Sequence, residues 1–213
     1  MKRTVTPILS PDRPGGFLIT DRALEFCQFP PGAALLDIGC GNGASVEHIR
    51  SRHGLRITGL DADREKTGLS KGLICASALH IPSADAAFEG VLMECSLSVM
   101  DKPDAVLSEC RRVLKPRGWL IISDVYSRGR AARFDGRLAR LENRETIEKR
   151  LSDNGFRVEL FQDFSEQLRA IWGQMIFDRG LDLCCADFRT DKATLKAVRT
   201  GYSLFVSRKD GPA

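Results

Sequence analysis

Short apolar runs alternate with longer polar stretches along most of the chain. Seven runs have the length and the aliphatic or β-branched character of strands: 33–39, 56–61, 72–77, 90–95, 119–125, 157–162 and 202–208. Several of the polar stretches between them have helical composition and end at Gly or Pro, as helices commonly do. The pattern predicts strands and helices in alternation.

This alternation predicts an α/β fold with a mainly parallel sheet, because right-handed crossovers place helices on both faces of such a sheet. Two segments fall outside it. Residues 1–32 are expected to form an N-terminal helical arm, and residues 165–201 a helical insertion between the last two strands. With 213 residues, 43% of them hydrophobic, the chain suits a single domain spanning 1–213.

Composition narrows the location and the partners. No apolar run approaches the roughly 20 residues that span a bilayer, and the N-terminal sequence lacks a secretory signal, so we expect a cytoplasmic protein without a membrane partner. The seven cysteines show no C-x-x-C spacing, which favours reduced thiols and predicts no metal site. A basic cluster at 128–140 is interpreted as solvated surface, with nucleic acid as the less favoured partner.

A glycine-rich turn follows the first predicted strand. Gly39, Gly41 and Gly43 permit a tight turn that a ligand can approach closely, at the strand end where open α/β sheets bind ligands. Asp61 ends the second predicted strand, 22 residues after Gly39, where an acid accepts hydrogen bonds from ribose hydroxyls. Both features also fit a nicotinamide dehydrogenase, since residues 39–44 read G-x-G-x-x-A.

The remaining motifs favour another class. The stretch "LLDIGCGNG" resembles the first motif of class I S-adenosylmethionine-dependent methyltransferases. In order along the chain, "GLDAD", "CASALHIPSADAAFEGVLMECSLSVM", "ECRRVLKPRGWLIISD" and "YSLFVSRK" are similar to that family's later motifs, and the resemblance covers roughly residues 14–208. It implies a Rossmann-like sheet of seven strands in the order 3-2-1-4-5-7-6, with the last strand antiparallel, and S-adenosylmethionine as cofactor.

The resemblance also implies a set of cofactor-binding residues. They are Asp37, Gly39, Cys40, Gly41, Asn42, Gly43, Asp61, Ala62, Ser77, Ala78, Leu79 and Glu94. Asp37 to Gly43 would surround the methionine part, Asp61 the ribose, and Ala62 and Leu79 the adenine ring. Ser77 departs from the family, which usually has Asp there, and its hydroxyl binds the adenine amino group more weakly than a carboxylate would.

The reaction requires alignment and, for oxygen or carbon acceptors, a base. Glu94, Cys95 and His80 are the catalytic candidates, and Asp124 and Tyr126 are further candidates for a base by their position after strands. A soft sulfur, selenium or arsenic nucleophile would need no base. "IISDVYS" resembles arsenite methyltransferases, but their longer cysteine-bearing connection is missing, and the adjacent Cys184 and Cys185 do not converge on one atom if helical.

The acceptor is expected to be a small molecule, bound under the arm and the insertion. Tyr126, Trp172 and Met175 are the predicted substrate-lining residues, and Arg13, beside Gly15 and Gly16, is a candidate partner for the cofactor carboxylate. The "RPGG" segment and the "WGQMIF" helix are also similar to an uncharacterised group of bacterial methyltransferases. Two alternatives remain open: a dinucleotide-dependent oxidoreductase, and an inactive cofactor-binding or nucleic-acid-binding module.

Overall fold

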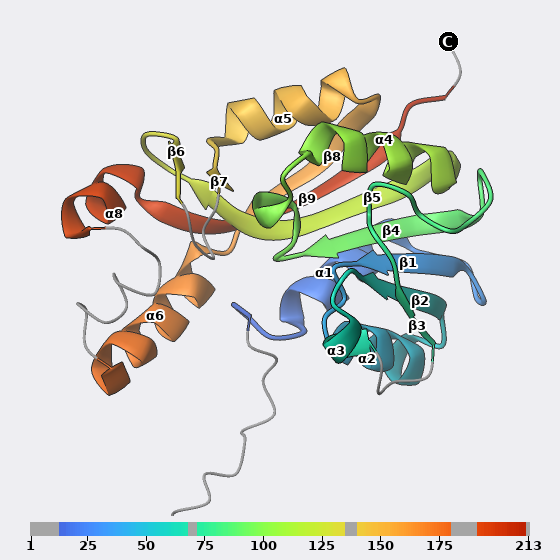
Figure 1. The fold of residues 1–213 in the computed structure, drawn as a ribbon, viewed down its shortest axis with the longest axis horizontal. Helices are drawn as coiled ribbons and strands as arrows, with labels where there is room; N and C mark the ends of the chain where they lie inside the picture. The colour runs from blue at the N-terminus through green and yellow to red at the C-terminus, as the bar shows by residue number, and fades with distance from the viewer. Residues whose placement is uncertain (1–12, 68–71, 135–139, 180–190, 212–213) are drawn as a thin grey trace, which may run out of the picture.

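The computed structural model describes residues 13–67, 72–134, 140–179 and 191–211, without the side chains of residues 66, 175, 176, 178 and 179. A seven-stranded sheet in the order β3-β2-β1-β4-β5-β9-β8 runs through the molecule (Figure 1). Its strands are β1 (Ala34–Ile38), β2 (Arg56–Asp61), β3 (Leu73–Cys75), β4 (Phe88–Glu94), β5 (Leu114–Ser127), β8 (Phe156–Asp163) and β9 (Thr200–Lys209).

The predicted topology is confirmed. The first five strands pair in parallel, and β9 is antiparallel to both of its neighbours, β5 and β8. Counted within this sheet alone, the order is 3-2-1-4-5-7-6, the Rossmann-like arrangement that the sequence predicts.

Helices cover the sheet on both faces (Figure 1). Helices α4 (Pro103–Val113) and α5 (Arg144–Asp153) pack on one face, and α1 (Leu18–Cys27), α2 (Ala44–His53) and α6 (Ser165–Arg179) on the other. The shorter helices are α3 (Arg64–Thr67), η1 (Leu97–Val99) and α8 (Lys192–Val198). Among the described residues, none of the helices has the length and apolar character needed to cross a membrane.

The alternating side chains of the central strands build two cores. In β5, Leu120 and Ile122 pack into the core under α4 and α5, whereas Trp119 and Ile121 pack into the core with α1. Both faces are therefore buried, which explains why the strands read as continuous apolar runs. The Trp119 indole also donates a hydrogen bond to the Cys27 carbonyl (3.1 Å), which fixes the end of the N-terminal helix on the sheet.

Two parts of the fold differ from the pattern. Strand β5 begins at Leu114, five residues before the predicted start, and β6 (Ala132–Arg133) pairs with β7 (Arg140–Leu141) in a small hairpin that the sequence did not predict. Strands of two residues carry no periodicity that a sequence pattern can reveal. The predicted insertion at 165–201 contains α6 and α8, while Cys184 and Cys185 lie outside the described residues.

Candidate active site

The turn after β1 is anchored to the end of β2. The amides of Gly39 and Cys40 both donate to the Leu60 carbonyl, at 2.7 and 3.2 Å, and the Gly43 amide donates to the Cys40 carbonyl at 2.9 Å. All three glycines of the turn have φ between +56° and +82°, a conformation that costs other residues about 1–2 kcal/mol. The sequence needs glycine here because the chain reverses between a strand and a helix.

The glycines of the turn have different surroundings. A Cβ added at Gly39 would lie 2.6 Å from Ser96 Cβ, so this glycine is required for packing. A Cβ added at Gly41 would meet nothing within 4 Å. Gly41 therefore leaves open space beside the turn, as expected where a ligand approaches the backbone.

Asp61 is held in place by the same turn. Its Oδ2 accepts the Gly41 amide at 2.8 Å, and its Oδ1 accepts the Asp63 amide at 2.9 Å. Each oxygen keeps a further lone pair, because a carboxylate offers about four acceptor positions. The carboxylate is thus fixed in orientation while it can still accept bonds from a ligand's hydroxyl groups.

These elements border a cavity of about 400 Å³ at the carboxyl ends of the parallel strands, which we name the strand-end cleft. Its volume lies within the range of small-ligand pockets. The cleft is lined by Ile38, Gly39, Leu60, Asp61, Ala62, Ser77, Ala78, Leu79, Cys95, Ser96, Val99, Met100, Asp101, Lys102 and Val106. Six of the predicted cofactor residues, Gly39, Asp61, Ala62, Ser77, Ala78 and Leu79, therefore meet in one cavity.

The other predicted cofactor residues surround the turn without lining the cleft. Gly41 and Gly43 carry the turn, and Asn42 Oδ1 accepts the Ala44 amide at 3.3 Å where α2 begins. The Cys40 side chain packs against β2, its Sγ within 2.8 Å of where a Cβ on Gly59 would be. Desolvation, reinforced by the charges of Asp37 and Asp61, raises the pKa of this thiol to about 12, so it is protonated at neutral pH.

Asp37 is a buried carboxyl group at the end of β1, 2% exposed. Burial, and next the negative charge of Glu94, raise its pKa well above the usual value, although Arg13 opposes this effect. Such a group favours a nearby positive charge, because a cation would relieve the cost of ionising it.

Glu94, at the end of β4, is already engaged by the N-terminal arm. Arg13 forms an ion pair with Glu94 Oε2, which also accepts a hydrogen bond from Ser45 Oγ (2.7 Å), and Thr20 Oγ1 donates to Glu94 Oε1 (2.7 Å). Arg13 also contacts both hydroxyls, at 2.8 Å each. The arm, α1 and α2 are thus joined at one buried carboxylate, which has three donors and is poorly placed to act as a free base.

Cys95 lines the strand-end cleft and has a left-handed backbone conformation with φ +52°. Its sulfur lies 3.0 Å from the hydroxyl of the buried Tyr202, which in turn contacts the Ser123 carbonyl (3.1 Å). Although part of the residue is exposed, desolvation of the sulfur and the charge of Asp124 raise the pKa of the thiol to about 12. The thiol is therefore protonated at neutral pH.

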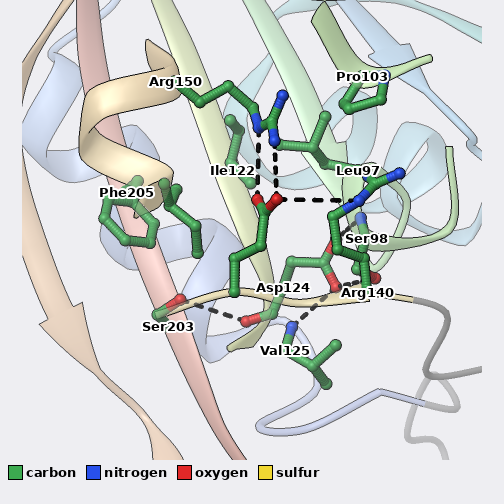
Figure 2. A pocket seen from close by; sticks show the side chains of 12 residues that line it. Leu97, Ser98, Pro103, Ile122, Asp124, Val125, Arg140, Arg150, Ser203 and Phe205 are labelled. Carbon is green, nitrogen blue, oxygen red and sulfur yellow. Dashed lines mark hydrogen bonds and ion pairs between the residues drawn. The ribbon is translucent and has the colours of Figure 1, made fainter. Parts of the chain in front are cut away.

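Asp124 lies in a separate small cavity of about 30 Å³, room for about one water molecule. Figure 2 shows its carboxylate turned toward Ser98 and the Val125 amide, with Arg140 and Arg150 beyond it. Ser98 donates through its amide and its hydroxyl, each at 2.8 Å. Asp124 thus anchors the segment after β4 and does not line the strand-end cleft.

The remaining candidates lie apart from the cleft. His80 is exposed and close enough to Glu109 of α4 to lower the pKa of that carboxyl, although Arg112 has the larger effect. Tyr126 is buried, donates to Asp163 Oδ2 (3.0 Å) and packs edge-on against Phe161. Trp172 packs against the core under α6. The Met175 side chain lies outside what the structure describes.

The ends of the basic cluster at 128–140 are described. Arg128 forms an ion pair with Asp163 (3.9 Å), and Arg140 donates to the Met100 carbonyl (3.0 Å) and pairs with Glu142 (3.9 Å). These two arginines are engaged within the chain, and the interpretation of the cluster as solvated surface stays a prediction.

The Arg13–Glu94 pair could be found only in part from the sequence. The sequence singled out both residues near the cofactor, but 81 positions separate them, and no local spacing links an arm to a strand end. The sequence feature that pointed to Arg13 was its position just before the glycine pair Gly15-Gly16 and a predicted helix.

Comparison with known proteins gives this geometry its context. Residues 36–122 match a family model described as a methyltransferase domain. The O-methyltransferase resE of Aspergillus sclerotiorum is 29% identical over 204 residues, which cover 84% of this chain and 76% of that protein.

Solved structures share the fold. The [4+2]-cyclase SpnF is 26% identical to this chain and superposes with a TM-score of 0.70. The superposition covers 91% of this chain and 80% of SpnF. Geranyl diphosphate C-methyltransferase from Streptomyces coelicolor A3(2) is 16% identical and superposes with a TM-score of 0.72. That superposition covers 90% of this chain and 81% of the enzyme.

The resemblance predicted from the sequence is confirmed. The methyltransferase-domain match over residues 36–122, the similarity to an O-methyltransferase and the Rossmann-like sheet together support a class I S-adenosylmethionine-dependent methyltransferase. These relatives come from a fungus and a bacterium, so the bacterial source expected from the sequence stays a prediction.

Proposed function

We propose that this methyltransferase binds S-adenosylmethionine in the strand-end cleft and transfers the methyl group to a small molecule that bears an acidic hydroxyl group. The observation that carries the proposal is the fixed Asp61 carboxylate beside the open space at Gly41, on the border of a 400 Å³ cavity. S-adenosylmethionine supplies an activated methyl group on a sulfonium.

The cleft supports distinct roles for its residues. Asp61 would accept hydrogen bonds from the ribose hydroxyls. Ala62 and Leu79 would flank the adenine ring, and the Ser77 hydroxyl would accept a hydrogen bond from the adenine amino group. The buried Asp37 would favour the positively charged end of the cofactor, since its raised pKa marks a site where a cation stabilises the ionised form. Cys95 and Ser96, at the other end of the cleft, are where the acceptor would enter.

The nature of the acceptor follows from the titratable groups at that end. Glu94 is paired with Arg13, Asp124 accepts three hydrogen bonds from Ser98 and Val125, and the raised pKa of Cys95 makes it a poor base. None of these three groups is therefore a free base, and Asp101 is the carboxyl group in this part of the cleft lining that remains as a candidate. An acceptor that ionises readily, such as a phenol or an enol, needs little help of this kind.

The soft nucleophile considered from the sequence is less well supported. A metalloid or selenide site would use thiolates, and the two thiols nearest the turn, Cys40 and Cys95, are both protonated at neutral pH. Relatives named O-methyltransferase also favour oxygen.

The test is methyl transfer from isotope-labelled S-adenosylmethionine to a series of substituted phenols of falling pKa. Aliphatic alcohols, 2-mercaptoethanol, selenide and arsenite form the other arms. We expect kcat/KM to rise as the phenol pKa falls, with no transfer to the alcohols. Transfer to alcohols with a bell-shaped pH profile would reveal a dedicated base, and transfer confined to the selenide or arsenite arm would contradict an oxygen acceptor.

A second function is favoured by one observation. The chain is similar over most of its length to a [4+2]-cyclase, so this fold also supports a reaction other than methyl transfer. The same assay distinguishes the two, because a cyclase would bind the cofactor yet leave its methyl group in place with every acceptor.

A further inference from the structure

Two histidines and an aspartate meet between the first two helices, away from the strand-end cleft. His48 Nε2 lies 2.6 Å and His53 Nε2 2.8 Å from the same oxygen, Asp21 Oδ1. Asp21 belongs to α1 and both histidines to α2. Among the described residues, this is the group of His, Cys, Asp and Glu side chains whose ligand atoms lie close enough together to hold a metal ion.

The helices and a neighbouring ring orient these side chains. Five positions separate the histidines, so their rings leave α2 about 140° apart and approach Asp21 from two sides. The His48 ring stacks on Phe17, with centroids 3.9 Å apart and planes 2° from parallel, which directs its Nε2 toward α1. This spacing differs from the four-residue spacing typical of helical metal sites, and the prediction of no metal from the sequence rested on the cysteine spacing alone.

The charges and the exposure also suit a cation. Burial opposes ionisation of Asp21, but hydrogen bonds from His48 and His53 together lower its pKa below the usual value. Arg52 faces the other carboxylate oxygen at 3.7 Å and is largely exposed, so Oδ1 remains directed at the histidines. The three side chains are each 15–26% exposed, which leaves an entry path from solvent.

We propose that Asp21, His48 and His53 bind a divalent transition-metal ion of the zinc class. Two imidazole nitrogens and a carboxylate oxygen are ligands that Zn²⁺ accepts in proteins, with a water in the fourth position. Tetrahedral bond lengths place ligand atoms about 3.3 Å apart, so each histidine nitrogen would move away from the Asp21 oxygen by roughly 0.5–0.7 Å. Each ring would carry its proton on Nδ1, leaving the Nε2 lone pair for the ion.

The site has a consequence for the arm. Thr20 precedes Asp21 on α1, and Ser45 lies on α2, and both hydroxyls hold Glu94. An ion that joins α1 to α2 would therefore hold together the two helices that carry these donors. The role is structural, since none of the three ligands lines the strand-end cleft.

The experiment is calorimetric titration of tag-free protein with Zn²⁺, together with the visible spectrum of the Co²⁺ form. We expect one ion per chain, an imidazole-rich tetrahedral Co²⁺ spectrum without a thiolate charge-transfer band, and a raised melting temperature. His53→Asn and Asp21→Asn should each weaken binding by about 100-fold or more, since even outer-sphere partners of metal ligands are worth 10–100-fold.

His80→Asn is the matched control, because this third histidine is exposed and remote from the cluster in the chain. It should bind Zn²⁺ like the wild type. His53→Asn is the main variant, since His53 ends α2 at the surface and its loss should leave the apo protein folded by circular dichroism. Absence of Zn²⁺ binding, equal binding by the three variants, or a thiolate band in the Co²⁺ spectrum would each overturn the proposal.

Discussion

The turn after β1 and the C-terminal end of β5 both hold residues that the sequence predicted to be functional, yet their side chains are used differently. Around the turn, the backbone arranges Gly39, Gly41 and Asp61 through hydrogen bonds between neighbouring strand ends. At the end of β5, the side chain of Asp124 is hydrogen-bonded to Ser98 and that of Tyr126 to Asp163. The turn, which we propose as the cofactor side, is therefore determined by local chain geometry, and the end of β5, which the sequence predicted to be on the acceptor side, by tertiary packing.

The largest effect on stability is expected at the ion pair between Arg13 of the N-terminal arm and Glu94 of β4. Arg13→Ala would leave Glu94 buried without its cation, and breaking such a pair costs about 3–5 kcal/mol of unfolding free energy. Urea denaturation measures it. The double variant Arg13→Met with Glu94→Met should recover most of the loss, because no uncompensated charge remains. Equal stability of Arg13→Ala and wild type would show that the arm does not hold Glu94 in solution.

Gly39 and Gly41, two of the three glycines of the turn, should separate an effect on packing from an effect on cofactor binding. Gly39→Ala forces a Cβ to within 2.6 Å of Ser96 and should cost about 2–4 kcal/mol of stability. Gly41→Ala should cost about 1 kcal/mol, from backbone strain alone, and yet weaken cofactor binding more than 10-fold. Thermal melts and titration with S-adenosylhomocysteine measure the two effects. If Gly41→Ala binds normally, the open space beside the turn is not used by the cofactor.

Strands β1, β2 and β4 could be predicted because each is a short apolar run that ends at a polar or glycine residue. The cleft followed from them, since parallel strands bring Gly39, Asp61 and Ser77 to one edge. The roles of Tyr126 and Trp172 could not be predicted, because a buried aromatic side chain and a substrate-lining one look alike in sequence. The partner of Glu94 depends on how the arm folds back, a contact over 81 positions.

A pH effect is expected at Asp37. The raised pKa means that the unfolded chain ionises this carboxyl first as pH rises, which favours unfolding until the folded state also ionises. Stability should therefore fall as pH rises from the usual aspartate pKa to the raised pKa of about 8 in the folded state. Asp37→Asn removes this contribution and should be more stable than wild type at pH 9, with the difference shrinking toward pH 4. Parallel stability curves would contradict the raised pKa.

At the end of β5, a smaller effect on stability is expected. Tyr126→Phe removes one hydrogen bond to Asp163 and should cost about 1 kcal/mol of stability. Because the hydroxyl does not line the cleft, kcat/KM should not change at a temperature where the variant is folded. A large fall in kcat/KM with unchanged stability would restore Tyr126 as a substrate-binding residue and remove the contrast between the two regions.

The most direct measurement is calorimetric titration of wild-type protein with S-adenosylhomocysteine, beside Asp61→Ala, the neighbouring control Asp63→Ala, and NADH. We predict micromolar binding by wild type and Asp63→Ala, and a loss of about 100-fold in Asp61→Ala because Asp61 supplies the charged acceptors for the ribose. NADH, the ligand of the alternative oxidoreductase, should not bind. Equal affinity of Asp61→Ala and wild type would contradict the assignment of the strand-end cleft as the cofactor site.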